Sequence, residues 1–275
     1  MDPQISDKPI VVTPAETRER LLEKARRKKT PLRRGFVQAP PGSDNREGPL
    51  AQFVSNSDRR GLLAYLLVLA VTSAEDSQDG WTTTRDSLVW ARALDFTETA
   101  TESSARTAVR KAFARLEERK LLICAHTGKS SRASVTLLRE DGSGTPYTHP
   151  GKKEGPDAKA EGRYFQISNR LWTDGYVDGL GLPAIAMLLV LLAERGARTD
   201  ALRLEQMPDW YGWSADSAAR GLKQLEEAKI VTTDKVYRKE PLLAQGWTAV
   251  NTYAVEPPFG PTRSNRSKGG DESDV

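Results

Sequence analysis

Basic side chains are concentrated on one predicted helix near the middle of the chain, with hydroxyl groups between them. The residues of its polar face and their basic neighbours are Ser103, Arg106, Thr107, Arg110, Lys111 and Arg115. An arginine can donate to O6 and N7 of guanine together, and a serine or threonine can contact a base or a phosphate. From Arg106 onward no acidic residue appears until Glu117. The pattern favours contact with duplex DNA over the alternative, a helix face that is only solvated.

The segment after this helix carries two more cations. Lys129 and Arg132 lie in TGKSSR at 127–132, between two predicted strands. Small residues there would let the backbone approach a phosphate. The Gly-Lys-Ser triplet that begins at Gly128 is not expected to bind a nucleotide, because Ile123 stands where a phosphate-binding loop needs glycine.

A second basic cluster lies near the start of the chain. Residues 18–34 hold nine basic and two acidic side chains. Four of the basic residues are consecutive, namely Arg26, Arg27, Lys28 and Lys29. A helix from 14 to about 29 should precede or include them, with Thr13 as N-cap and Glu16 closing a capping box. We expect residues 1–50 to form a basic arm and linker that contacts phosphates, the alternative being a solvated charge run.

Two parts of the chain resemble each other. RLEERKLL at 115–122 matches QLEEAKIV at 224–231, an offset of 109 residues. Upstream, YLLVLA at 65–70 mirrors MLLVLL at 187–192. Two anchors in the same order favour a duplication or convergence on one fold.

These anchors divide the chain into a first block, 51–140, and a second block, 163–256. A linker rich in glycine, proline and charge joins them at 141–162, and 257–275 is expected to be a disordered tail. In the first block, helices are expected at 58–73, 85–94 and 102–119, with strands at 81–84, 121–126 and 132–138. In the second, helices are expected at 183–195, 204–210 and 214–228, with strands at 164–167, 230–237 and 248–255.

This element order resembles the winged helix-turn-helix family. Residues 103–122 and 214–231 are each similar to the family's third helix and its exit into the wing. The resemblance implies an α+β, mainly α fold of two winged-helix domains, with the third helix in the major groove and the wing along the backbone or minor groove. The chain departs from the family at Lys120 and Lys229, where glycine is usual.

The two third helices differ in charge. At the 109-residue offset, the counterparts of Arg106, Thr107 and Arg110 are Ala215, Asp216 and Ala219. Only Lys111 keeps its charge, as Arg220, with Lys223 as a further candidate for backbone contact. We therefore expect the first block to carry specificity. The second would touch only the backbone, form a homodimer or hold a protein partner.

Composition excludes several other kinds of chemistry. The 275-residue chain has one cysteine, Cys124, and two histidines. Intramolecular disulfides and zinc sites built from several thiolates are therefore excluded. We expect no catalytic residues, no metal and no cofactor. The longest apolar runs, 62–71 and 184–193, are about half of the ~20 residues that a bilayer requires, so we expect no membrane partner and a cytoplasmic location.

The function expected from the resemblance is sequence-specific binding of double-stranded DNA, as a transcriptional regulator. The first alternative is initiation of replication on a plasmid or other mobile element, because tandem winged-helix initiators are similar in layout. The second alternative is a protein-interaction adaptor similar to the accessory subunits of bacterial condensins. An adaptor would not need the arginines at 106 and 110.

Overall fold

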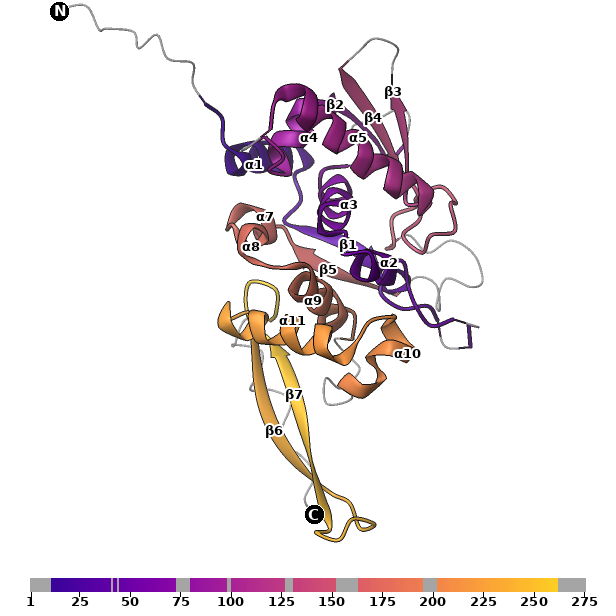
Figure 1. Ribbon diagram of the computed structural model, residues 1–275, viewed down its shortest axis with the longest axis vertical. Helices are drawn as coiled ribbons and strands as arrows, with labels where there is room; N and C mark the ends of the chain where they lie inside the picture. The colour runs from indigo at the N-terminus through magenta and orange to yellow at the C-terminus, as the bar shows by residue number, and fades with distance from the viewer. Residues whose placement is uncertain are drawn as a thin grey trace, which may run out of the picture.

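The protein is described from a computed structural model, shown in Figure 1. It describes residues 11–40, 42–43, 45–72, 80–97, 100–126, 131–151, 163–194 and 202–261. Helices and strands are mixed along the chain. Helices α3 (Arg59–Val71) to α5 (Glu102–Glu118) lie at one end of the long axis, and strands β1 (Lys29–Arg33) and β5 (Tyr164–Ser168) lie in the middle (Figure 1). Helices α9 (Leu182–Glu194) to α11 (Ala215–Glu227) lie beyond them, where the hairpin of β6 (Val231–Lys239) and β7 (Trp247–Val255) extends from the body.

The first block folds in the predicted order. Its elements are α3 (Arg59–Val71), β2 (Thr82–Asp86), α4 (Ser87–Ala93), α5 (Glu102–Glu118), β3 (Leu122–His126) and β4 (Arg132–Leu137). The three strands form an antiparallel sheet in the order β2-β4-β3. Every residue of α3 from Gly61 to Val71 is buried. The long apolar run that could not span a bilayer is therefore the central helix of this block.

The second block repeats the order without the first strand of the sheet. Its elements are β5 (Tyr164–Ser168), α7 (Arg170–Thr173), α8 (Tyr176–Gly179), α9 (Leu182–Glu194), η3 (Leu204–Gln206), α10 (Met207–Tyr211), α11 (Ala215–Glu227), β6 (Val231–Lys239) and β7 (Trp247–Val255). Helix α9 packs against α11 so closely that a Cβ on Gly221 would lie 2.4 Å from the Pro183 carbonyl oxygen. Glycine is required at that crossing.

The N-terminal segment lies within the packed body, which differs from the arm expected from its charge. It forms α1 (Pro14–Ala25), β1 (Lys29–Arg33), η1 (Arg34–Phe36) and α2 (Leu50–Ser55). The Thr13–Glu16 capping box is present, and α1 buries Leu21 and Leu22 against α3 and α4. Strand β1 pairs antiparallel with β5. The high charge of this segment suggested an exposed arm. The fold instead buries the apolar residues that lie between its cations.

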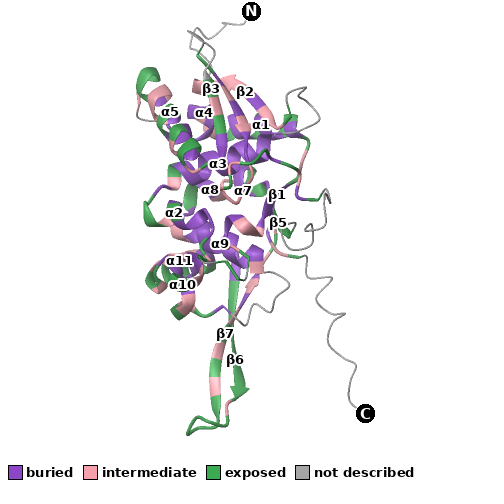
Figure 2. Ribbon diagram, turned by 90° about the vertical axis from the view of Figure 1, so that its right-hand side faces the viewer, coloured by how far each residue is buried: buried purple, intermediate pink, exposed green. Residues whose placement is uncertain are grey.

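The two blocks share one continuous hydrophobic core, visible as buried residues through α3, β1, β5 and α9 (Figure 2). Polar contacts also join the N-terminal segment to both blocks. Arg18 donates to both carboxylate oxygens of Asp178, each at 2.8 Å, and Arg33 pairs with the buried Glu140. Residues 141–151 of the expected linker pack in part, since Tyr147 is buried against Trp81. The rest of that linker, 152–162, lies outside the described residues.

Of the expected tail, the structure describes residues 257–261, in which Phe259 is buried against Tyr176 at 5.2 Å between ring centroids. Residues 262–275 lie outside the described part. Among the described helices, none combines the length and apolar character needed to cross a bilayer.

The two positions where the sequence departs from the family share one backbone conformation. Lys120 has a φ of 56° and Lys229 a φ of 57°, both in the left-handed region that ends α5 and α11. Glycine adopts this region without the steric cost that a Cβ imposes. The left-handed backbone thus gives the physical reason why glycine is expected at these two turns.

Changing Lys229 to glycine should raise the free energy of unfolding by about 0.5–1 kcal/mol, because it removes left-handed strain. The side chain is exposed, so few contacts are lost. The matched control is Lys223→Gly in the middle of α11, which should lower the same quantity by about 1 kcal/mol. Urea unfolding measures both, and a loss of stability in both variants would contradict the explanation.

Candidate nucleic-acid interface

Helix α5 has one apolar face and one polar face, as its periodicity predicted. Its buried residues are Ala105, Val109, Ala112, Phe113 and Leu116. Thr101 caps its start by accepting a hydrogen bond from the Ser104 amide at 3.3 Å. The buried face packs on α3 and α4, so the opposite face is fixed toward solvent.

Two cations on that polar face are fully exposed. Arg110 and Lys111 both point to solvent, and Ser103 is exposed one turn or more before them. Thr107 is half-buried, and its hydroxyl donates to the Ser103 carbonyl at 2.9 Å. Among the described residues, Arg110 makes a single long hydrogen bond, 3.4 Å from Nη2 to the Thr107 hydroxyl. Its guanidinium therefore keeps most of its donors for a partner.

Arg106 is held by an acidic neighbour, Asp86, that lies 20 residues earlier in the chain. Its Nη1 donates to Asp86 Oδ1 at 2.8 Å, and Asp86 also accepts from the Leu88 amide at 2.8 Å as the N-cap of α4. The Ser131 hydroxyl donates to the same carboxylate. Burial raises the pKa of Asp86, but these hydrogen bonds outweigh it and the pKa lies below its ordinary value. Asp86 thus joins α4, α5 and the start of β4.

Arg115 serves the fold rather than the exposed face. Its Nε and Nη2 donate to the two oxygens of Asp58 at 3.0 and 2.9 Å, and Arg119 donates to the same carboxylate at 2.6 Å. Asp58 is the N-cap of α3 and accepts from the Gly61 amide at 2.9 Å. Burial raises the pKa of Asp58, yet these donors hold it below its ordinary value. An aspartate just before a buried helix was the available signal for both Asp58 and Asp86.

The other first-block candidates lie at the hairpin. Arg132 is exposed at the start of β4, beside Ser131. Lys129 lies outside the described residues. The hairpin therefore contributes one described cation next to the Asp86 cluster.

The N-terminal cations divide between solvent and the fold. Arg26, Lys28 and Lys29 are exposed, whereas Arg27 donates to the carbonyls of Leu69 at 3.1 Å and Ala70 at 3.3 Å, at the end of α3. A cation there offsets the partial negative charge of a helix C-terminus. Deleting residues 1–34 would remove α1 and β1 from the core, so that deletion would not test phosphate contact alone.

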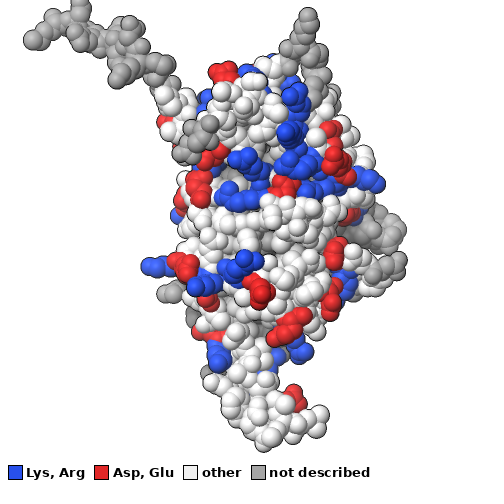
Figure 3. Space-filling model, in the orientation of Figure 1, with Lys and Arg blue, Asp and Glu red and all other residues white. Residues whose placement is uncertain are grey.

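Helix α11 offers fewer available cations. Arg220 donates to the Ser217 hydroxyl at 3.1 Å, and Lys223 lies 4.0 Å from Glu227. Asp216 is exposed at its start. Helices α5 and α11 nevertheless lie on the same face of the molecule, as the two perpendicular views show (Figures 1 and 2). On that face Lys and Arg gather over α5, whereas over α11 they alternate with acidic residues (Figure 3).

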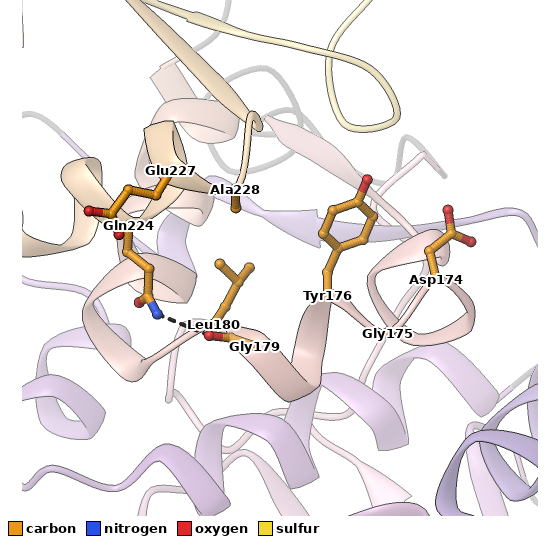
Figure 4. Close-up of a pocket in the computed structure, with 8 residues that line it drawn as sticks. All are labelled: Asp174, Gly175, Tyr176, Gly179, Leu180, Gln224, Glu227 and Ala228. Atoms are coloured by element: carbon orange, nitrogen blue, oxygen red, sulfur yellow. Dashed lines mark hydrogen bonds between the residues drawn. The ribbon is translucent and has the colours of Figure 1, made fainter.

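A hollow of about 370 Å³ lies between α8 and the end of α11 (Figure 4). Gln224 closes one side by donating to the Gly179 carbonyl and accepting from the Gly181 amide, both at 2.9 Å. Asp174 and Glu227 are its charged lining residues. Its lining residues include no cation, so the hollow offers no charged donor to a phosphate.

The described residues contain no group of three or more His, Cys, Asp and Glu side chains placed to hold a metal ion. Burial and the nearby Glu117 raise the pKa of the Cys124 thiol to about 11. That thiol is therefore protonated at neutral pH and a poor nucleophile.

Comparison with known proteins adds no relative. A scan against models of protein families gives no match, and searches of the curated proteins and of the solved structures find no similar chain.

Proposed function

We propose that this chain is a tandem winged-helix protein that binds duplex DNA sequence-specifically, as a cytoplasmic transcriptional regulator. The observation that carries the proposal is the exposed Ser103, Arg110 and Lys111 face of α5, which its buried face fixes toward solvent. A helix of this kind fits the major groove of B-DNA.

The arrangement of the first block supports the winged-helix assignment. The order α3-β2-α4-α5-β3-β4 is that expected from the family resemblance, and the three strands join in one β2-β4-β3 sheet. The second block has the order α9-α10-α11-β6-β7, and both blocks turn from their third helix into the hairpin through a left-handed lysine. These parallels support a duplication.

In the proposed complex the cations have different roles. Arg110 has free donors and would read a guanine, whereas Lys111 would contact phosphate. Arg106 would contact DNA while it remains bonded to Asp86. That bond limits the orientations that its guanidinium can take. Arg220 and Lys223 would add backbone contact from α11.

Arg110→Ala should weaken binding to a selected DNA site by about 1–3 kcal/mol and relax preference at one or two base pairs. Arg106→Ala should do the same or less, because its side chain is shared with Asp86. Arg220→Ala and Lys223→Ala should cost less and act equally on all sequences. Each variant is titrated against the selected site and a scrambled duplex, with thermal unfolding to verify the fold.

Loss of discrimination in Arg220→Ala, with Arg106→Ala and Arg110→Ala unaffected, would reverse this assignment. The second block would then be the specificity module. Its possible role in a homodimer or in holding a protein partner stays a prediction.

One observation favours the replication-initiator alternative. The blocks share a core and present α5 and α11 on one face, so one chain can contact two successive stretches of a duplex (Figure 1). Footprinting shows which sites the protein covers, and the genomic location of those sites distinguishes the two functions. Iterated sites beside an origin support an initiator, and a single palindrome at a promoter supports a regulator.

A further inference from the structure

A cavity of about 550 Å³ lies where the two blocks meet. The end of β1, the end of α9, the segment after β4 and the segment before β5 all contribute to its wall. Five arginines line it, namely Arg33, Arg34, Arg46, Arg139 and Arg163. The carboxylates among its lining residues are Asp141 and Glu194.

The acidic groups near the cavity offset only part of its positive charge. Arg33 is occupied by the buried Glu140, and Arg139 Nε lies 2.7 Å from Asp141. Three other arginines, Arg34, Arg46 and Arg163, remain. Of these, only Arg34 forms an ion pair within the described chain, with 3.9 Å between its Nη2 and Glu194 Oε2.

Two of these guanidinium groups also have buried donors without an acceptor. Arg34 Nη2 and Arg46 Nε are shielded from solvent and donate no hydrogen bond to the described residues. The remaining contacts of both side chains hold them in place. Arg34 Nε donates to the Ala193 carbonyl, and Arg46 lies over the Trp210 ring at 5.1 Å. Buried cationic donors are costly unless an acceptor satisfies them.

The size and chemistry of the cavity fit a small anion-bearing molecule. Its volume lies within the range of small-molecule sites, roughly 300–1,000 Å³. Guanidinium forks match the oxygen geometry of phosphate. Ala39, Pro40 and Ala193 supply an apolar part of the wall. We propose that this cavity binds a nucleotide-sized molecule through its phosphate groups, with Arg34, Arg46 and Arg163 as the principal donors.

A ligand there would touch both blocks. Arg46 and Arg163 come from segments on either side of the first block, and Arg34 contacts the end of α9. The β1–β5 pair beside the cavity lies away from the face that carries α5 and α11 (Figure 2). A bound molecule would therefore bias the relative position of the two helices without covering them. This regulatory consequence, unlike the binding itself, rests on the proposed DNA function.

The test is calorimetric titration of the full chain with pyrophosphate, metal-free ATP and adenosine. Pyrophosphate and ATP should bind, and adenosine should not. Arg163→Ala, which removes an exposed side chain, and Arg46→Ala should each weaken ATP binding by at least about tenfold. The control is Arg20→Ala, which removes the same charge from the exposed surface of α1. Thermal unfolding verifies that each variant is folded. If Arg46→Ala does not fold, Arg163→Ala alone tests the proposal.

Any of four results would overturn the proposal. The first is no binding of pyrophosphate or ATP up to about 5 mM. The second is an equal loss of ATP affinity in Arg163→Ala and Arg20→Ala, and the third is adenosine binding as tightly as ATP. The fourth is that Arg163→Ala weakens binding of a fluorescent DNA duplex as much as it weakens binding of ATP, which would assign these arginines to the DNA backbone. Because the titration contains no DNA, a protein that fails to bind duplex can still bind ATP here.

Discussion

Replacing Arg33 with methionine should lower the free energy of unfolding by about 3–5 kcal/mol. The Arg33 side chain is 7% exposed and the Glu140 side chain is 0% exposed. Arg33 also donates to the Thr148 carbonyl at 2.8 Å and its hydroxyl at 2.9 Å. Methionine fills much of the same volume but leaves the buried Glu140 carboxylate without a cation. An unpaired buried charge is strongly destabilising.

The loss should depend on pH with a definite sign. Burial raises the pKa of Glu140, and the charge of Arg33 opposes that rise. Without Arg33 the folded-state pKa rises further above the unfolded value of about 4.3. The folded variant then binds more protons than the unfolded chain, so its stability falls as pH rises between those two pKa values. Urea unfolding should show a smaller loss in Arg33→Met at about pH 4.5 than at about pH 7.5.

The double variant Arg33→Met with Glu140→Leu is the control. Removing both charges should regain most of the lost stability, since the Thr148 groups are exposed and can bond to water. A single variant that loses less than about 1 kcal/mol would show that the pair is solvated. A double variant no better than the single one would show that Arg33 acts by packing.

Affinity for duplex DNA should fall about a thousandfold between 50 and 200 mM salt, as expected for six or more phosphate contacts. The described cations on the relevant face that could make them are Arg106, Arg110, Lys111, Arg132, Arg220 and Lys223. Fluorescence anisotropy with a pool of genomic fragments measures the slope. Lys111→Ala removes one exposed cation. It should reduce the steepness of the plot of log affinity against log salt concentration by about one.

Arg115→Ala separates the fold from the interface in the same titration. Because Arg115 is bonded to Asp58, its loss should lower thermal stability while leaving the salt slope unchanged. Undetectable binding at low salt would reject DNA as the partner and favour the protein-interaction adaptor.

Local patterns predicted much of the fold. The helices at 102–119 and 214–228 were placed within one or two residues, because apolar periodicity and capping residues mark a helix directly. The polar face predicted for α5 lies opposite its buried residues, with Arg110 and Lys111 exposed. The capping box at Thr13 is confirmed as well, although α1 ends at Ala25, where Arg26 turns left-handed with a φ of 51°.

Partners distant in sequence were not predictable. Arg115 looked like the other cations of its helix, and only the fold brings Asp58 to it, 57 residues earlier in the chain. Arg27 likewise looks in the sequence like one member of a charge run. In the fold it donates to three carbonyls at the end of α3. Charge indicates that a residue seeks a counter-group, but the sequence alone does not tell whether that group is a phosphate or a carboxylate.

The β1–β5 pairing has a consequence for biosynthesis. Strand β1 ends at Arg33 and its partner begins at Tyr164, so β1 leaves the ribosome well before its partner exists. At about 5–20 residues per second, the delay is roughly ten seconds. Throughout that time a nascent chain carries an unpaired strand edge with Leu32 on it, a residue that is fully buried in the finished protein. The first block therefore cannot acquire its complete N-terminal packing during translation until synthesis has passed into the second.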